Sequence, residues 1–361
     1  MSKKLRITAS LLSVFIFILV SVLAVFLMVK FITPPQTSEQ TKQEEITENK
    51  KIEEDQDEKQ VGTLNGNMFQ TNKFGLQSTI ASDDINIYRY STSLKNALVK
   101  TDMKENKTSA VLSGYEVKHL TIVKNNLFFA MSQYDDEGSK YFSIAYLNTK
   151  DDSVNIIKST ASDDITSIVS DGKYIYFTRN DYQIYQTDTD ENTVKLFKTS
   201  SSANYPVLIG INNGKLYYIN GSTMCSLGIH SKQNQVISLQ YCSEEQMPIL
   251  TDDGIISFTT LAKNQIDKIS FDGELIQTLI TEEKLPSESL RIDSMNYYNG
   301  YVFLSIDNHV YYLDKNKDYT LIQIDGEITE ANTIYTTDKY LIFDKEKDGN
   351  VVFMSYNQIF D

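Results

Sequence analysis

The residue types that carry enzyme chemistry are scarce in this sequence and are not grouped. Its three histidines, His119, His230 and His309, stand far apart, without the nearby cysteines or carboxylates that a zinc site requires. The chain contains no Gly-x-Ser-x-Gly nucleophile elbow and no phosphate-binding glycine loop. The sequence therefore predicts no catalytic residue and no metal ligand, and we interpret the histidines as ordinary strand or loop residues.

One acidic segment, residues 134–139 (Tyr-Asp-Asp-Glu-Gly-Ser), has the composition of a calcium loop. Calcium prefers about six to eight oxygen ligands, and the late bidentate glutamate of an EF-hand is missing here. We expect a solvated hairpin tip, and calcium stays the one cofactor that the sequence leaves open. The string Ala-Ser-Asp-Asp-Ile occurs at 81–85 and 161–165. The chain is built of repeating units, and the two copies stand at different places within their units. We therefore interpret the match as coincidence.

The elements that must position any site are short β-strands, which recur at a regular spacing. Seven turn pairs each precede an aromatic-rich strand: Asp83-Asp84, Asn125-Asn126, Asp171-Gly172, Asn213-Gly214, Asp253-Gly254, Asn299-Gly300 and Asp338-Lys339. From one pair to the next, the spacings are 42, 46, 42, 40, 46 and 39 residues. Asp-Gly and Asn-Gly favour two-residue type I′ turns, because both central residues there need a positive φ.

Each unit has room for four short strands; in the third unit we predict strands at 164–169, 173–178, 183–187 and 194–199. Four strands in about 40–45 residues is the blade length of a β-propeller. No amphipathic helix is evident after residue 60. The sequence therefore predicts an all-β, seven-bladed propeller over residues 61–361, with six blades and an irregular unit as the alternative.

The last unit is one strand short. We expect residues 67–70 to supply its outer strand and so to close the ring, which removes exposed sheet edges. A disordered leader is the alternative for this segment.

The N-terminal segment has the composition of a membrane anchor. Ile7–Val29 carries no charge and has basic residues on both sides, and about 20 apolar residues in a helix span a bilayer. The run is longer than the roughly 7–15-residue apolar core of a signal peptide and lacks a small-residue cleavage site. We therefore expect an uncleaved single-pass anchor rather than a cleaved signal peptide. Residues 1–6 are then a basic cytoplasmic tail, and the propeller is extracytoplasmic.

Residues 30–60 contain too few apolar side chains to fold and are predicted to be an acidic flexible linker, with a solvated helix as the alternative. The formal net charge of the chain is −14; since the first 32 residues carry +4 and residues 33–60 carry −5, −13 remains for the propeller. An acidic domain repels phosphate backbones, so nucleic acid is not an expected partner. The expected partners are the membrane, through residues 7–29, and an unidentified extracytoplasmic protein or cell-wall component.

The chain has two cysteines, Cys225 and Cys242. The position that mirrors Cys225 across the intervening turn lies near Ser238, so the two cysteines are not direct cross-strand neighbours. We expect two buried thiols, while one disulfide in an oxidising compartment remains the alternative.

Residues 176–179 (Tyr-Phe-Thr-Arg) resemble the Tyr-Trp-Thr-Asp motif of the LDL-receptor YWTD propellers, and residues 184–190 and 266–273 resemble the third strands of that family. Over about residues 66–361 the chain resembles membrane-anchored propeller proteins of unknown function found in clostridia, which are themselves similar to the YWTD propellers. The resemblance implies an anchored propeller. It implies no catalytic residue, because the family has no agreed activity.

Strands alternate in direction within a blade, which separates two faces. The turn face carries the first-to-second and third-to-fourth turns, and the loop face carries the second-to-third loops and the links between blades. Binding residues concentrate on loops held by rigid scaffolds. We therefore predict a non-enzymatic binding or scaffolding module with its site on the loop face; a surface enzyme that acts on wall glycans or peptides, with two carboxylates in the propeller mouth, is the alternative. The candidate binding residues are Tyr115, Tyr134, Asp135, Arg179, Asp181, Tyr182, Tyr205, Tyr241, Glu245, Arg291 and His309.

Overall fold

The computed structural model describes residues 80–160, 163–188, 194–199, 206–238, 248–259, 265–286, 292–307, 309–324, 333–337, 339–345 and 350–360. All of them belong to the second of the two units into which the chain divides, Asp57–Asp361. The predicted anchor at 7–29, the linker at 30–60 and the strand at 67–70 lie outside the described residues. Within the described ranges, no helix is long and apolar enough to cross a membrane.

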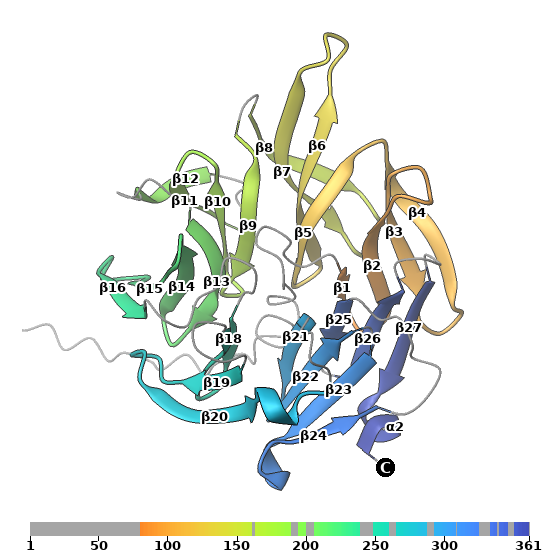
Figure 1. Ribbon diagram of the computed structural model, residues 1–361. Helices are drawn as coiled ribbons and strands as arrows, with labels where there is room; N and C mark the ends of the chain where they lie inside the picture. The colour runs from red at the N-terminus through yellow and green to blue at the C-terminus, as the bar shows by residue number, and fades with distance from the viewer. Residues whose placement is uncertain are drawn as a thin grey trace, which may run out of the picture. The chain divides into compact units, whose positions relative to one another are not determined.

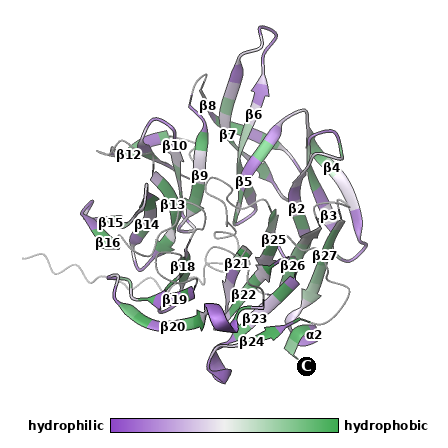
Figure 2. Cartoon of the chain, viewed as in Figure 1, coloured by the Kyte–Doolittle hydropathy of each residue, from purple (hydrophilic) through white to green (hydrophobic). Residues whose placement is uncertain are grey.

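Seven antiparallel sheets stand around a ring, and the first strand of each lies towards its centre (Figure 1). The prediction of a seven-bladed, all-β propeller is therefore confirmed. Figure 2 shows apolar residues along the strands and hydrophilic residues at the turns, as expected for blades that pack face against face.

The blades follow one another in chain order. Blades one to four contain β1 (Ile80–Ser82), β2 (Asn86–Ser91), β3 (Ala97–Asp102), β4 (Lys107–Ser113), β5 (Glu116–Val123), β6 (Asn126–Tyr134), β7 (Lys140–Asn148), β8 (Val154–Thr160), β9 (Ile165–Ser170), β10 (Tyr174–Arg179), β11 (Gln183–Asp188), β12 (Val194–Thr199), β13 (Pro206–Asn212), β14 (Lys215–Asn220), β15 (Thr223–Gly228) and β16 (Asn234–Ser238). Blades five to seven contain β17 (Ile249–Thr251), β18 (Gly254–Thr259), β19 (Gln265–Ile269), β20 (Leu275–Thr281), the 3₁₀ turn η1 (Glu282–Lys284), β21 (Ile292–Tyr298), β22 (Tyr301–Ile306), β23 (His309–Asp314), the 3₁₀ turn η2 (Lys315–Lys317), β24 (Thr320–Gln323), β25 (Thr333–Thr336), β26 (Tyr340–Lys345) and β27 (Asn350–Ser355).

The described residues of blade seven form three strands, after which the chain turns into the short helix α2 (Tyr356–Phe360). The expectation of no helix after residue 60 was wrong at this point, because five residues are too few to show a helical period. Two aromatic rings four residues apart hold α2 against blade six. Tyr356 stacks on Tyr298 with ring centroids 4.4 Å apart, and Phe360 stacks on Tyr301 at 4.2 Å.

The first and last blades close the ring through a shared apolar cluster. Ile80 and Ile87 of blade one pack with Tyr335 and Ile342 of blade seven, and all four side chains are fully buried. Complete removal of this apolar surface from water stabilises the closed ring without any covalent link.

The predicted type I′ turns are confirmed at Asn213-Gly214, with φ of 47° and 69°, and at Asn299-Gly300, with φ of 48° and 89°. Two other turns lie one residue earlier than predicted, at 124–125 and 252–253, because the strand pairs that close them are Val123 with Asn126 and Thr251 with Gly254. The seventh predicted pair includes Asp338, which lies outside the described residues.

The pairs Asp83-Asp84 and Asp171-Gly172 do not form two-residue turns as predicted. They stand in four-residue loops, since Ser82 pairs with Ile87 and Ser170 with Ile175. The Asp171 carboxylate stabilises the longer loop through hydrogen bonds. Its Oδ1 accepts from the amides of residues 173 and 174, at 2.9 and 2.7 Å, while its Oδ2 accepts from the Tyr176 hydroxyl at 3.2 Å. The side chain of Asp83 does the same in blade one, so an Asp followed five residues later by Tyr marks this loop.

We expect Gly214→Val to lower the free energy of unfolding by about 1–3 kcal/mol, because a β-branched residue is strained at a φ of +69°. No atom lies within 4 Å of the added Cβ, so backbone strain is the whole effect. Urea unfolding should show the loss for valine and little change for Gly214→Asn, which tolerates this conformation. Equal stabilities for the two variants would contradict the turn assignment.

Cys225 is a buried, free thiol in β15 that pairs with Val236 across the sheet. Burial raises its pKa, and a hydrogen bond with Tyr218 offsets part of that rise. Cys242 lies outside the described residues.

Candidate functional site on the loop face of blades two and three

The described candidates all lie on the loop face, and most of them belong to blades two and three. Tyr115 links β4 to β5, Tyr134 and Asp135 begin the β6–β7 loop, and the segment 179–182 joins β10 to β11. His309 stands alone on blade six, at the start of β23, so the structure does not bring it to the others. Tyr205, Tyr241, Glu245 and Arg291 lie outside the described residues.

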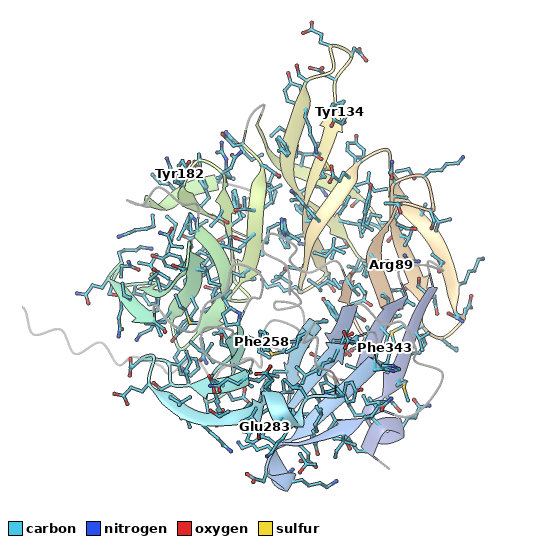
Figure 3. All side chains as sticks on the ribbon, in the orientation of Figure 1. Arg89, Tyr134, Tyr182, Phe258, Glu283 and Phe343 are labelled. Atoms are coloured by element: carbon cyan, nitrogen blue, oxygen red, sulfur yellow. The ribbon has the colours of Figure 1, made fainter. Side chains whose placement is uncertain are left out.

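Strands β6 and β7 are nine residues long and form an arm that projects beyond the neighbouring blades (Figure 1). The Asp135 carboxylate closes its tip by accepting from the amides of Glu137 and Ser139, at 3.0 and 2.7 Å. The Tyr134 side chain beside it is 70% exposed (Figure 3). The expected hairpin tip is present, and no three His, Cys, Asp or Glu side chains are grouped to hold a metal ion in the described part of the chain.

An ion pair braces the base of the arm. Lys140 Nζ lies 2.8 Å from Glu116 Oε2, and the Ser132 hydroxyl donates to the same oxygen at 3.2 Å. The hydrogen bond from Lys140 holds the pKa of the Glu116 carboxyl below its usual range, although partial burial opposes this shift. The Lys140 ammonium also lies 5.8 Å from the centre of the Tyr134 ring, a distance at which a cation attracts an aromatic face.

Arg179 is the centre of a second network on blade three. Its guanidinium pairs with the carboxylate of Asp163, lies 3.7 Å from Asp181 Oδ2 and covers the Tyr185 ring at 4.9 Å. The Tyr185 hydroxyl donates to Asp181 at 2.5 Å. Burial, reinforced by this bond to a carboxylate, raises the pKa of Tyr185 to about 12. The loop that carries residues 179–182 is thus fixed by charged hydrogen bonds, which are stronger than neutral ones.

Tyr182 stands at the end of this braced loop. Its φ is +66°, and 42% of the residue is exposed (Figure 3). A bulky residue in this left-handed conformation costs about 1–3 kcal/mol, and such strain persists where surrounding structure imposes it, often at functional sites.

The seam between blades two and three lies beneath these loops. Lys118 Nζ in β5 pairs with Asp164 Oδ2 at 2.7 Å, and the next residue, His119, is only 2% exposed. His119 has a φ of +59° and belongs to a bulge, since the register of β5 against β6 shifts between Lys118 and Thr121. Burial lowers the pKa of His119 to about 3, with a further contribution from the charge of Lys118. The imidazole is therefore neutral near pH 7.

The sequence interpretation missed most of the residues that organise this site. Lys118, Asp163 and Asp164 were not among the candidates, and His119 was treated as an ordinary strand residue. Asp163 and Asp164 belong to the second copy of Ala-Ser-Asp-Asp-Ile. The first copy lies in the β1–β2 turn and the second precedes β9, which confirms that the copies differ in structural position. The sequence did contain one signal for this network. Two aspartates follow the last strand of blade two, and an arginine ends the second strand of blade three.

The alternative of a glycoside hydrolase needs a carboxyl group with a raised pKa as general acid. In the described residues, the carboxyl groups with a shifted pKa are all shifted downward. Hydrogen bonds from Lys140 and Ser153 lower the pKa of Glu116 and Asp151, respectively. Burial would raise the pKa of Asp253, but Lys268 at 2.7 Å outweighs it.

Comparisons with known proteins agree with the class of β-propellers and define no finer group. No family model matches the sequence. No curated protein matches it either.

Solved structures are similar in fold alone. Oligogalacturonate lyase from Vibrio parahaemolyticus shares 9% identity with a TM-score of 0.54, over 79% of this chain and 90% of its own. The computationally designed Ika8 protein shares 12% identity with a TM-score of 0.51, over 82% of this chain and 98% of its own. BamB from Moraxella catarrhalis shares 12% identity, with a TM-score of 0.43, over 77% and 79% of the two chains.

Proposed function

We propose that this protein is a binding module that presents the loop face of blades two and three to a ligand or protein partner. The observation that carries the proposal is Tyr182, an exposed residue with a φ of +66° that directly follows the Arg179–Asp181 ion pair. Ordered loops with exposed tyrosine and flanking charge are the usual anchors of recognition surfaces, because little entropy is lost when they bind. Tyr134 on the projecting arm adds a second exposed ring to the same face.

We further propose that Ile7–Val29 anchors the module in the cell membrane, with the propeller outside as a scaffold at the bacterial surface. The uncharged run and its basic flanks support this placement. The resemblance to membrane-anchored clostridial propellers and to the YWTD propellers agrees with it. Deletion of residues 1–32 should move the chain from the membrane fraction to the soluble fraction after cell lysis. A deletion variant that still sediments with membranes in high salt would contradict the anchor.

We expect Tyr182→Gly to reduce partner capture at least tenfold while leaving the melting temperature equal to or slightly above that of the wild type. Glycine removes the aromatic anchor but adopts a φ of +66° without strain, so loss of binding is separated from loss of folding. The measurement compares partners crosslinked to the full-length chain in cells, quantified against the amount of chain recovered.

The matched control is Ile85→Ala, because Ile85 is a large, 65% exposed apolar residue in the β1–β2 turn on the opposite face. Its capture should equal that of the wild type. If Tyr182→Gly retains capture and Ile85→Ala loses it, the partner binds the turn face and the proposal is wrong.

A further inference from the structure

The outer end of the arm extends beyond both neighbouring strands of blade two. The pairing of β5 with β6 ends at Ser132, and the pairing of β8 with β7 ends at Phe142. Strands β6 and β7 continue past these positions for two more residue pairs, the outer of which joins Tyr134 to Lys140. Neither β5 nor β8 covers this part of the arm (Figure 1). An uncovered strand edge is a place where another chain can pair.

The backbone of Tyr134 faces this uncovered edge of β6. At the tip of the arm, the amide of Asp135 donates to the carbonyl oxygen of Ser139 at 2.9 Å. Hydrogen-bonded and non-hydrogen-bonded pairs alternate along an antiparallel ladder, so the next pair, Tyr134 with Lys140, directs its N–H and C=O groups away from the partner strand. The edge of β6 therefore presents a donor and an acceptor to an extended chain that lies beside it.

Polar contacts hold the outer part of the arm in place. A two-stranded hairpin is at most marginally stable by itself. Here Lys140 Nζ pairs with Glu116 at the base of the arm and lies 5.8 and 5.4 Å from the ring centres of Tyr134 and Phe142. The Asp135 carboxylate fixes the tip through two backbone amides. A surface that is ordered in advance loses little entropy when it binds a partner.

Carboxylates outnumber cations on the loop face of blades two and three. Its described segments are 114–118, 133–141, 163–164 and 179–182. They contain seven Asp and Glu residues and three Lys and Arg residues, so their net charge is −4. All three cations, Lys118, Lys140 and Arg179, pair with carboxylates. At the tip of the arm Asp136 and Glu137 are exposed, and neither forms an ion pair with a described residue. The charge that this face presents to a partner is therefore negative.

The exposed tyrosine rings also favour a cationic partner. Tyr134 is 70% exposed and Tyr182 is 42% exposed (Figure 3). A Lys or Arg side chain is attracted both to an aromatic face and to a carboxylate. An anionic glycan or a lipid phosphate would be repelled. A second copy of this chain would be repelled as well, because each copy carries a formal net charge of −14.

We propose that the arm binds an extended, basic segment of a partner protein. The segment lies along the uncovered edge of β6, with its Lys or Arg side chains at Asp136, Glu137 and the Tyr134 ring. This assignment rests on the proposed function and names the chemistry of its partner. The outward N–H and C=O groups of Tyr134 favour a protein segment over a small polycation, because only a peptide supplies matching backbone groups.

The test titrates the full-length chain in detergent, by calorimetry, with a short peptide of alternating lysine and valine. A matching peptide of alternating glutamate and valine and the polyamine spermine are the comparison probes. The lysine peptide should bind, and its affinity should fall when NaCl is raised from about 50 mM to about 500 mM. The other two probes should bind about tenfold more weakly or not at all. Equal binding of either comparison probe, or no binding of the lysine peptide, overturns the assignment.

Asp136→Lys combined with Glu137→Lys should weaken binding of the lysine peptide about tenfold, because two attractions become repulsions. The matched control is Glu105→Lys combined with Glu274→Lys, which changes the net charge equally at exposed positions of the turn face. The control should bind as the wild type does, and both double variants should melt within about 2 °C of it. Tyr134→Ala should weaken binding about threefold, whereas Tyr134→Phe, which keeps the ring, should not. Equal affinities of the two double variants would overturn the assignment.

The crosslinking assay separates this assignment from the proposed function. If Tyr182→Gly loses partner capture while the double variant Asp136→Lys and Glu137→Lys retains it, the binding module stands and the assignment to the arm falls. If the double variant loses capture while Tyr182→Gly retains it, the arm is the binding element and the proposed Tyr182 anchor falls.

Discussion

Gly273→Ala should lower the free energy of unfolding by about 3–5 kcal/mol, the sum of backbone strain and forced overpacking. Gly273, between β19 and β20 of blade five, has a φ of +92°. An added Cβ would overlap the carbonyl oxygen of Ile237 in β16 and would lie 2.9 Å from its carbonyl carbon. Both obstacles are backbone atoms, so the neighbouring strand of blade four would have to move.

Urea or thermal unfolding of the variant measures this effect, and Gly138→Ala separates its two parts. Gly138 has a similar φ of +82°, but nothing lies within 4 Å of its added Cβ, so its alanine variant should lose only about 1 kcal/mol. Equal losses in the two variants would mean that blade five does not press on blade four at this point.

Acid should destabilise the wild-type protein by about 2 kcal/mol between pH 7 and pH 5 through His119 alone. The pKa of His119 is lowered to about 3 in the folded protein, against about 6.5 in an unfolded chain. Below pH 6.5 the unfolded state therefore binds a proton that the folded state does not. This draws the equilibrium towards unfolding, with an increasing effect down to about pH 3 and none above pH 6.5.

The measurement is the urea midpoint from pH 7.5 to pH 5, a range above the usual titration of carboxyl groups. His119→Gln keeps a polar side chain that cannot take up the proton. Between pH 7.5 and pH 5, the free energy of unfolding of this variant should therefore fall by about 2 kcal/mol less than that of the wild type. His309→Gln, which removes an exposed histidine, should keep the wild-type slope. A wild-type slope in His119→Gln would show that the imidazole is already solvated in the folded state.

Much of the fold is predictable because short stretches of sequence determine the strands and the turns. The strand predicted at 194–199 agrees with β12 to the residue, and the one predicted at 173–178 differs from β10 by one residue. The alternation of apolar side chains and the Asn-Gly turns act over fewer than ten residues, so they can be read without knowing what lies across the ring. Dependence on short segments also explains the errors at the Asp83 and Asp171 loops. In both loops the aspartate carboxylate accepts hydrogen bonds from nearby backbone amides, and the local sequence resembles that of a two-residue turn.

The candidate site is harder to predict because its contacts span the seam between two blades. Arg179, Asp181 and Tyr182 were expected on the loop face from the alternation of strands, and the structure places them there. That Arg179 pairs with Asp163 and that Lys118 pairs with Asp164, 46 residues further along, depends on how blade three is rotated against blade two. No local pattern encodes that rotation.

The periodic placement of turns and aromatic strands was sufficient to define seven β-rich units and the separation of a turn face from a loop face. Each of these features follows from hydrogen bonding and side-chain alternation between neighbours in the chain. The bulge that buries His119 and the approach of Gly273 to Ile237 arose from the packing of whole blades. Close packing turns small differences in strand register into the burial or exposure of a particular side chain, and such differences are invisible before the blades meet.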